Sequence, residues 1–166
     1  MKLPALICLL LLTVATYPQA AQRTGQSLCA ADEKVVFSCT VKRPAKFVSL
    51  CASADLTKDR GYLQYRFGVP GKIDLEFPST RAATQHQFQY SHYFRAQVDL
   101  TEINFVSNGY QYQIFDTYNG EEKPKVSEQG VSVTAPGKPK DVALKCTAKA
   151  KADFSILENV LTNESQ

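Results

Sequence analysis

The chain has 166 residues, a formal net charge of +3 at pH 7 and 44% hydrophobic residues. This length suits a single domain, and so small a net charge excludes nucleic-acid binding driven by bulk charge. After residue 21 no apolar run approaches the ~20 residues of a membrane-spanning helix, so we do not expect a membrane-spanning protein.

Residues 1–21 have the features of a secretory signal peptide. Lys2 precedes an apolar run from Leu3 to Val14, and small residues follow that run. We therefore expect the mature chain, residues 22–166, to be a single domain that is periplasmic or secreted.

The mature chain contains four cysteines, an even number that is typical of disulfide bonds in an exported protein. They are Cys29, Cys39, Cys51 and Cys146. We expect two disulfides, and the spacing leaves all three pairings open. The sequence lacks the C-x-x-C pairs of a zinc site, so we expect no metal, and we expect no cofactor.

The first predicted elements are a polar arm and a hairpin. Residues 22–32 are small and polar, and a disulfide from Cys29 would fasten this arm to the fold. Two runs rich in β-branched and aromatic residues follow, at 34–41 and 47–54, on either side of Arg43-Pro44-Ala45. This pattern predicts two antiparallel strands.

A second hairpin is predicted around Val69-Pro70-Gly71. Apolar residues alternate on both sides of this turn. A three-residue loop would pair Phe67 with Ile73, Tyr65 with Leu75 and Leu63 with Phe77 on the core face. It would also place Arg66 opposite Asp74 on the solvent face.

A meander of three strands is predicted from Phe88 onward. A turn at Leu100 and Thr101 would pair Val98 with Ile103. The next turn, Asn108-Gly109, has the sequence that a type I′ turn prefers. It predicts that Phe105 lies opposite Tyr112 and Ile103 opposite Ile114.

The last third of the chain contains shorter elements. A second Asn-Gly pair at 119–120 should end the third meander strand, and the charged residues 121–129 should form a loop. Two short strands are predicted at 130–135 and 142–148. Apolar residues at helical spacing then predict a short helix within 152–161.

Together these elements predict an all-β protein. About eight strands joined by short turns, with a short C-terminal helix, are typical of a single antiparallel β-barrel or sandwich. The pattern does not decide between the two.

Catalytic groups are few, and we do not expect an enzyme. The chain has two histidines, His86 and His92, and the aromatic neighbours of His92 favour a place in the core. Carboxylate pairs of the kind that glycosidases use are Asp99 with Glu102, and Asp116 with Glu121 or Glu122. Each pair falls near a predicted turn, where acidic residues are ordinarily solvated.

Tyrosines are the candidate binding residues, because they bring a large contact area and a polar tip to interfaces. Tyr110 follows the predicted turn at Asn108-Gly109. Tyr93 lies on the predicted solvent face of its strand. We expect Tyr110 and Tyr93 to contact a partner.

Three segments carry a resemblance to a known family. They are Ser49-Leu50-Cys51-Ala52-Ser53, the run from Gly61 to Gly68 (Gly-Tyr-Leu-Gln-Tyr-Arg-Phe-Gly), and Tyr93-Phe94-Arg95. Over about residues 36–133 the chain resembles a family of uncharacterised exported β-rich proteins of Gram-negative bacteria. That resemblance implies export and a β fold, and no activity comes with it.

In overall plan the chain is also similar to the periplasmic lysozyme inhibitors. Those proteins insert a loop containing Ser and Gly, with a nearby Tyr, into the lysozyme cleft. Ser107-Asn108-Gly109-Tyr110 is similar to that loop, but Asn stands between Ser and Gly and no Trp follows. The resemblance implies that Ser107, Asn108 and Gly109 contact the partner together with Tyr110.

The expected function is therefore that of an exported, non-enzymatic binding protein whose partner is another protein in the cell envelope or outside the cell. The resemblance implies a lysozyme or another cell-wall hydrolase as the partner to be inhibited. Two alternatives stay open: a small envelope hydrolase that uses the turn carboxylates, and an envelope structural or assembly factor.

Overall fold

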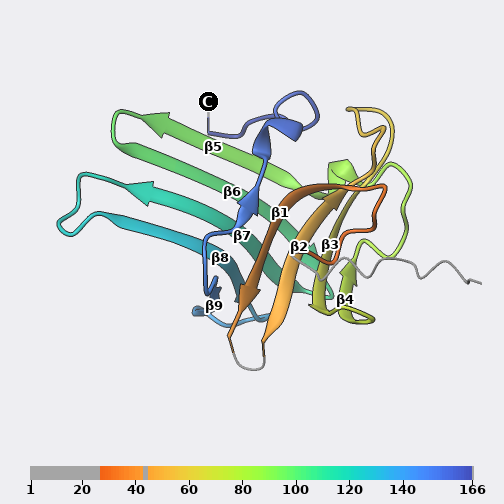
Figure 1. The fold of residues 1–166 in the computed structure, drawn as a ribbon, viewed down its shortest axis with the longest axis horizontal. Helices are drawn as coiled ribbons and strands as arrows, with labels where there is room; N and C mark the ends of the chain where they lie inside the picture. Colours follow the sequence, from red (N-terminus) through yellow and green to blue (C-terminus); the bar gives the residue numbers. More distant parts are fainter. Residues whose placement is uncertain (1–26, 43–44, 166) are drawn as a thin grey trace, which may run out of the picture.

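The protein folds into two five-stranded antiparallel sheets (Figure 1). The computed structural model describes residues 27–42 and 45–165, so the expected signal peptide lies outside the described residues. Sheet A has the strand order β10-β1-β2-β3-β4, and sheet B has the order β5-β6-β7-β8-β9. The predicted all-β antiparallel class is confirmed, and the two separate sheets form a sandwich-like arrangement rather than a closed barrel.

The strands of sheet A are β1 (Lys34–Val41), β2 (Lys46–Ala52), β3 (Leu63–Val69), β4 (Lys72–Phe77) and β10 (Lys151–Ala152). Those of sheet B are β5 (Gln89–Arg95), β6 (Val98–Ser107), β7 (Tyr110–Asn119), β8 (Val126–Thr134) and β9 (Asp141–Lys145). Two single 3-10 turns, η1 (Gln85–Gln87) and η2 (Phe154–Ile156), complete the elements of the described chain.

The core lies between the sheets and is aromatic at one end. The rings of Tyr65 in β3 and Phe77 in β4 each lie 4.9 Å from the ring of Phe105 in β6. Phe105 stacks in turn on Tyr112 of β7 at 4.8 Å. Aromatic pairs at such distances contribute about 0.5–1.5 kcal/mol each beyond their burial. Sheet A therefore packs on the half of sheet B that ends at the Asn108-Gly109 turn, which we call the proximal half.

The Asn108-Gly109 turn has the predicted register. Asn108 and Gly109 have φ angles of 51° and 79°, the left-handed conformations that a type I′ turn requires. Phe105 pairs with Tyr112, and Ile103 pairs with Ile114. The prediction that β7 ends at the second Asn-Gly pair is also confirmed, since Asn119 is its last residue.

The predicted turn at Leu100 and Thr101 is wrong. Both residues lie inside β6, and the turn falls at Ala96 and Gln97 instead. Gln97 adopts a left-handed conformation with φ of 65°, and its carbonyl accepts a hydrogen bond from the Gly120 N–H at 2.7 Å. The earlier turn gives β6 ten residues rather than six or seven, and so more ladder hydrogen bonds. We call the half of sheet B that ends at this turn the distal half.

The predicted pairing of the second hairpin is wrong: each β3 residue before the bulge lies opposite a β4 residue two positions further along the chain than predicted. Val69 pairs with Lys72 across Pro70-Gly71, and a β-bulge at Phe67/Gly68 then places Phe67 opposite Leu75. At Gly68 an added Cβ would lie 2.5 Å from the Lys72 carbonyl oxygen, so the bulge requires glycine. The apolar residues of β3 and β4 nevertheless share one face, as predicted. The shorter loop shifts the pairing by one residue and the bulge shifts it by one more, and a shift of two residues keeps every side chain on its face.

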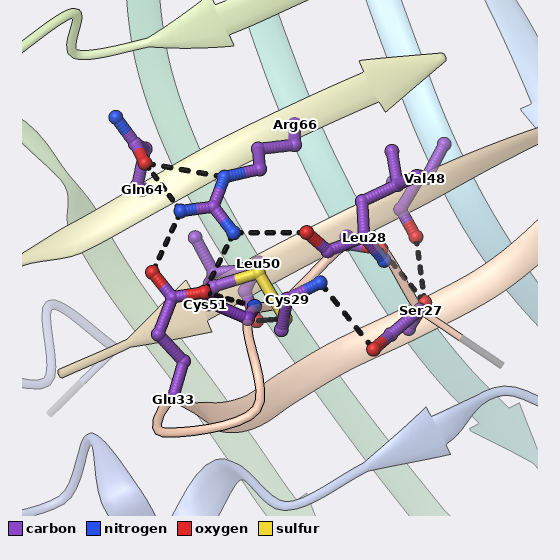
Figure 2. The surroundings of a disulfide bond; sticks show 12 residues. Ser27, Leu28, Cys29, Glu33, Val48, Leu50, Cys51, Gln64 and Arg66 are labelled. Carbon is purple, nitrogen blue, oxygen red and sulfur yellow. Dashed lines mark hydrogen bonds and ion pairs between the residues drawn. A yellow bond between two sulfur atoms is a disulfide. The ribbon is translucent and has the colours of Figure 1, made fainter. Parts of the chain in front are cut away.

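Arg66 lies opposite Glu76 rather than Asp74, and its side chain is only 3% exposed. The reason is the N-terminal arm, residues 27–33, which covers this face of sheet A (Figure 2). The Arg66 guanidinium donates to the Leu28 carbonyl at 2.9 Å and to both carboxylate oxygens of Glu33 at 2.6 Å. It also donates to Gln64 Oε1 at 2.6 Å. The face that the sequence predicts to be solvated is therefore buried.

The C-terminal segment forms no α-helix. Lys151 and Ala152 instead pair with β1, and the Asp153 N–H donates to the Val36 carbonyl at 2.8 Å. This strand pairing uses the residues that would begin the helix, so only the 3-10 turn η2 follows. Leu157, one of the predicted apolar positions, is fully buried in the core. Another correction concerns 121–129: β8 already begins at Val126, so the loop is shorter than predicted.

Two disulfides are present, as predicted, and they join Cys29 to Cys51 and Cys39 to Cys146. The first fastens the N-terminal arm to β2. The second links β1 of sheet A to the residue that follows β9 of sheet B. Structural disulfides persist in oxidising compartments, such as the periplasm or the extracellular space. Within the described residues no helix is long and apolar enough to span a membrane.

Candidate functional site

The distal half of sheet B carries two rows of polar and aromatic side chains on its inner face. One row contains His92, Thr101, Asp116 and Gln129, and the next contains Phe94, Asp99, Tyr118 and Ser127. They share a face with the core residue Ile103, because side chains two residues apart on a strand point the same way. In Figure 1 the ends of β5 to β8 extend to the left beyond sheet A.

A cleft of about 200 Å³ lies over these rows. We call it the distal cleft. Six of its lining residues come from sheet B and two from the C-terminal segment: Tyr90, His92, Asp99, Thr101, Asp116, Tyr118, Phe154 and Glu158. The C-terminal segment is fastened beside it, because Asn163 bridges to Tyr90 and its side chain bonds both the N–H and the carbonyl of His92 at 2.9 Å.

The distal cleft is acidic, with three carboxylates and one imidazole. His92 Nε2 lies 3.0 Å from Asp99 Oδ1. Burial raises the pKa of Asp116 above its ordinary value, and the negative charge of Asp99 raises this pKa further. A hydrogen bond of 2.7 Å from Gln129 Nε2 to Asp116 opposes that rise. Gln129 Oε1 accepts the Ala150 N–H at 2.8 Å, so the amide is fixed on both sides.

Three exposed aromatic side chains lie in the distal half of sheet B. Phe94 is 72% exposed although it lies on the inner face of sheet B, and Tyr118 opposite Asp99 is also exposed. Tyr93 is exposed on the other face of the same strand. Exposed aromatic residues beside polar groups are typical of interaction surfaces rather than of solvated sheet faces.

The structure separates the residues predicted to contact a partner into two places. Asn108, Gly109 and Tyr110 lie at the proximal end of sheet B, where Asn108 and Tyr110 are exposed and Ser107 is buried. Tyr93 pairs with Leu100 near the distal end. The ten residues of β6 join the two ends, and at about 3.3 Å per residue they span roughly 30 Å. One small site cannot include both.

The structure does not bring together the carboxylate pairs that the sequence predicts. Glu102 lies on the outer face of sheet B, away from Asp99. Glu121 forms an ion pair with Arg95, and Glu122 accepts a hydrogen bond from Asn119. Asp99 instead lies next to Asp116, since Asp99 pairs with Tyr118 two residues further along β7.

This association of Asp99 with Asp116 could have been found from the sequence. The Asn108-Gly109 turn alone fixes the β6–β7 register, which sets Thr101 opposite Asp116 and Asp99 opposite Tyr118. The wrongly predicted turn at Leu100 and Thr101 concealed it, because that turn ended β6 too early. The proximity of Phe154 and Glu158 had no sequence signal, since it depends on how the C-terminal segment folds back.

One cluster has metal-ligand chemistry among the described residues. The sulfur atoms of Cys29 and Cys51 and a carboxylate oxygen of Glu33 lie within 4.8 Å of one another. The two sulfurs are bonded to each other, and Glu33 is paired with Arg66, so these atoms already have partners. The cluster is part of the structure that fastens the N-terminal arm.

Comparisons with protein-family models, with curated proteins and with solved structures found no match to this chain.

Proposed function

We propose that the protein is an exported, non-enzymatic binding protein that inhibits a basic cell-wall hydrolase, with a lysozyme as the first candidate. The observation that carries this proposal is the exposure of Phe94, at 72%, at the position of β5 that pairs with Asp99 of the distal cleft. An aromatic residue that would otherwise be buried is an anchor for a partner, and anchors of this kind dominate binding energy at interfaces.

The charge of the distal cleft determines what kind of partner it suits. Asp99, Asp116 and Glu158 make this part of the surface acidic although the whole chain carries a small positive charge. Carboxylates beside aromatic rings bind an ammonium or guanidinium group through charge and cation–π attraction. Lysozymes are often basic, so a Lys or Arg side chain of such an enzyme is a suitable occupant. Local complementarity also increases the rate of association, even where the net charges do not.

Inhibition assays with several classes of lysozyme test this proposal. We expect the mature protein to inhibit at least one of them, and the variant F94A to weaken inhibition roughly tenfold to a hundredfold, as the loss of an aromatic anchor does. I73A is the matched control, because Ile73 is an exposed apolar residue of β4, away from sheet B. Y110A tests the hairpin tip that the resemblance to lysozyme inhibitors implies. A loss of inhibition with Y110A but not F94A would place the interface at the proximal end. No inhibition of any class would refute the proposal.

A second candidate function is hydrolysis by Asp99 and Asp116, and the raised pKa of Asp116 favours it. A carboxyl group with a raised pKa holds its proton to higher pH than an ordinary aspartate, and the protonated form can act as a general acid while a nearby carboxylate acts as the base. Diagonal neighbours on paired strands lie roughly 7–8 Å apart. The carboxyl groups of inverting glycosidases lie roughly 6.5–9.5 Å apart, a separation that side chains on diagonal backbone positions can reach.

The variant D116N tests this second candidate. A carboxyl group whose pKa is raised by folding destabilises the folded protein as it ionises, at pH values above its unfolded pKa. The neutral amide should therefore raise the melting temperature at pH 7. If Asp116 is the general acid, the same variant should lose at least about a hundredfold in reducing-end release from peptidoglycan. E102Q, on the opposite face of sheet B, is the control. Undetectable turnover by the unmodified protein would exclude this function.

A further inference from the structure

The outer face of sheet B carries a second cavity, on the side away from the distal cleft. Its volume is about 450 Å³, within the roughly 300–1,000 Å³ of small-molecule sites. The side chains that line it are amides and hydroxyls, chiefly Gln89, Asn104, Gln111, Gln113, Ser132 and Thr134. We call this group the amide row.

The amide row follows from the strand register. Gln89 pairs with Asn104, Asn104 with Gln113, and Gln113 with Ser132, so these four side chains lie abreast on β5, β6, β7 and β8. Gln111 and Thr134 are paired in the adjacent position. Strands lie about 4.8 Å apart, so the four abreast span roughly 14 Å. This length suits a ligand with several repeating units rather than a single small group.

Apart from Ser132, the side chains of the amide row form no hydrogen bond within the described residues. Each side-chain amide offers two donors and two acceptor positions. Among residues 27–42 and 45–165, the lining makes one internal side-chain hydrogen bond, from Ser132 Oγ to Asp141. The amides of Gln89, Asn104, Gln111 and Gln113 therefore keep their donors and acceptors available to a ligand.

The lining of this cavity is nearly free of charged side chains. The lining contains no Lys, Arg or His, and its one carboxylate, Asp141, already accepts a hydrogen bond from Ser132. A charged ligand would find no counter-charge there, whereas a neutral ligand with many hydroxyl or amide groups would be matched. Val106, 57% exposed, and Pro139 add apolar contact of the kind that the C–H face of a sugar ring requires.

We propose that the amide row is a binding site for a neutral oligosaccharide, and in particular for one that carries N-acetyl groups. An acetamido group offers one donor and one acceptor, the same groups as a side-chain amide, so the two can form paired hydrogen bonds. The site lies on the opposite face of sheet B from the distal cleft. A saccharide bound there would leave the distal cleft open to a partner.

Titration with the tetrasaccharide of β-1,4-linked N-acetylglucosamine, followed by NMR, tests the proposal on the full mature chain. We expect the side-chain amide signals of Asn104, Gln111 and Gln113 to shift, with maltotetraose giving weaker shifts because it has no acetamido groups. Unshifted signals at millimolar saccharide would overturn the proposal. Shifts produced by a neutral tetrapeptide but not by the saccharide would overturn it as well.

The double variant N104V/Q113V gives the complementary test. Valine suits strand positions, and the loss of two amides should weaken saccharide binding roughly tenfold or more. Q87A is the matched control, since Gln87 is an exposed amide outside sheet B. Unchanged affinity in the double variant would overturn the proposal. Should that variant not fold, the amide shifts of the unmodified chain still decide the question.

Discussion

The variant R66M is expected to lower the free energy of unfolding by about 3–5 kcal/mol, which is a large share of the roughly 5–15 kcal/mol that stabilises a typical domain. Methionine keeps much of the length of the Arg66 side chain but removes its charge. The Glu33 side chain, only 1% exposed, would then be a buried carboxylate without its cation. The Leu28 carbonyl and Gln64 Oε1 would also lose donors. Urea denaturation of both proteins measures the difference.

Two controls separate this effect from an ordinary ion pair. Lys46 and Asp74 form a more exposed pair at 2.8 Å, and K46M should cost about 0–1 kcal/mol. The double variant E33Q/R66M removes both charges, so it should be more stable than R66M alone. A loss below about 1 kcal/mol in R66M would contradict a structural role for this buried pair.

The pH dependence of the R66M effect follows from Glu33. Burial acts to raise the pKa of Glu33, but hydrogen bonds from Arg66, the Ala30 N–H and Tyr62 outweigh it and lower this pKa below its ordinary value. A carboxylate whose pKa is lowered by folding contributes stability above its unfolded pKa and loses it as pH falls through the folded pKa. The stability difference between the unmodified protein and R66M should therefore be full at pH 7 and shrink in acid.

The sequence predicts local features of this fold better than features that depend on distant segments. Asn108-Gly109 specifies its own turn, and that turn alone fixes the register of β6 and β7. The β5–β6 turn at Ala96 and Gln97 has no comparable signal, because a non-glycine residue adopts the left-handed conformation there. The acidic pair in the distal cleft was missed for this reason.

Burial of the outer face of sheet A shows the same limit. Tyr62, Gln64 and Arg66 alternate with core residues, and that alternation predicts a solvated face. The face is buried because the N-terminal arm folds over it, and the arm is placed there by the bond between Cys29 and Cys51. Spacing leaves three disulfide pairings open, so the covering segment could not be inferred from the sequence. Buried charge in this protein thus depends on a covalent link between segments 22 residues apart.

The second large effect is expected from the variant C39A/C146A, which removes the disulfide between the two sheets. The residues that it joins are 107 apart in the sequence, and closing a loop of that length accounts for about 4–5 kcal/mol of stability in the chain-entropy model. Removing the bond between Cys29 and Cys51, which closes a shorter loop, should cost about 3 kcal/mol. Urea denaturation of the two double variants compares these costs.

The position of the Cys39–Cys146 disulfide gives a second reason for its larger effect. Cys146 continues sheet B through its N–H, which donates to the Gln129 carbonyl, and it also forms a β-bridge with Val41 of sheet A. The sheets therefore share backbone hydrogen bonds at this corner, and the disulfide keeps them aligned. The N-terminal arm has other anchors, since Arg66 still binds Leu28 and Glu33 when Cys29 is replaced. If C29A/C51A proved the less stable of the two variants, this order would be wrong, and the arm rather than the junction between the sheets would determine the stability of the fold.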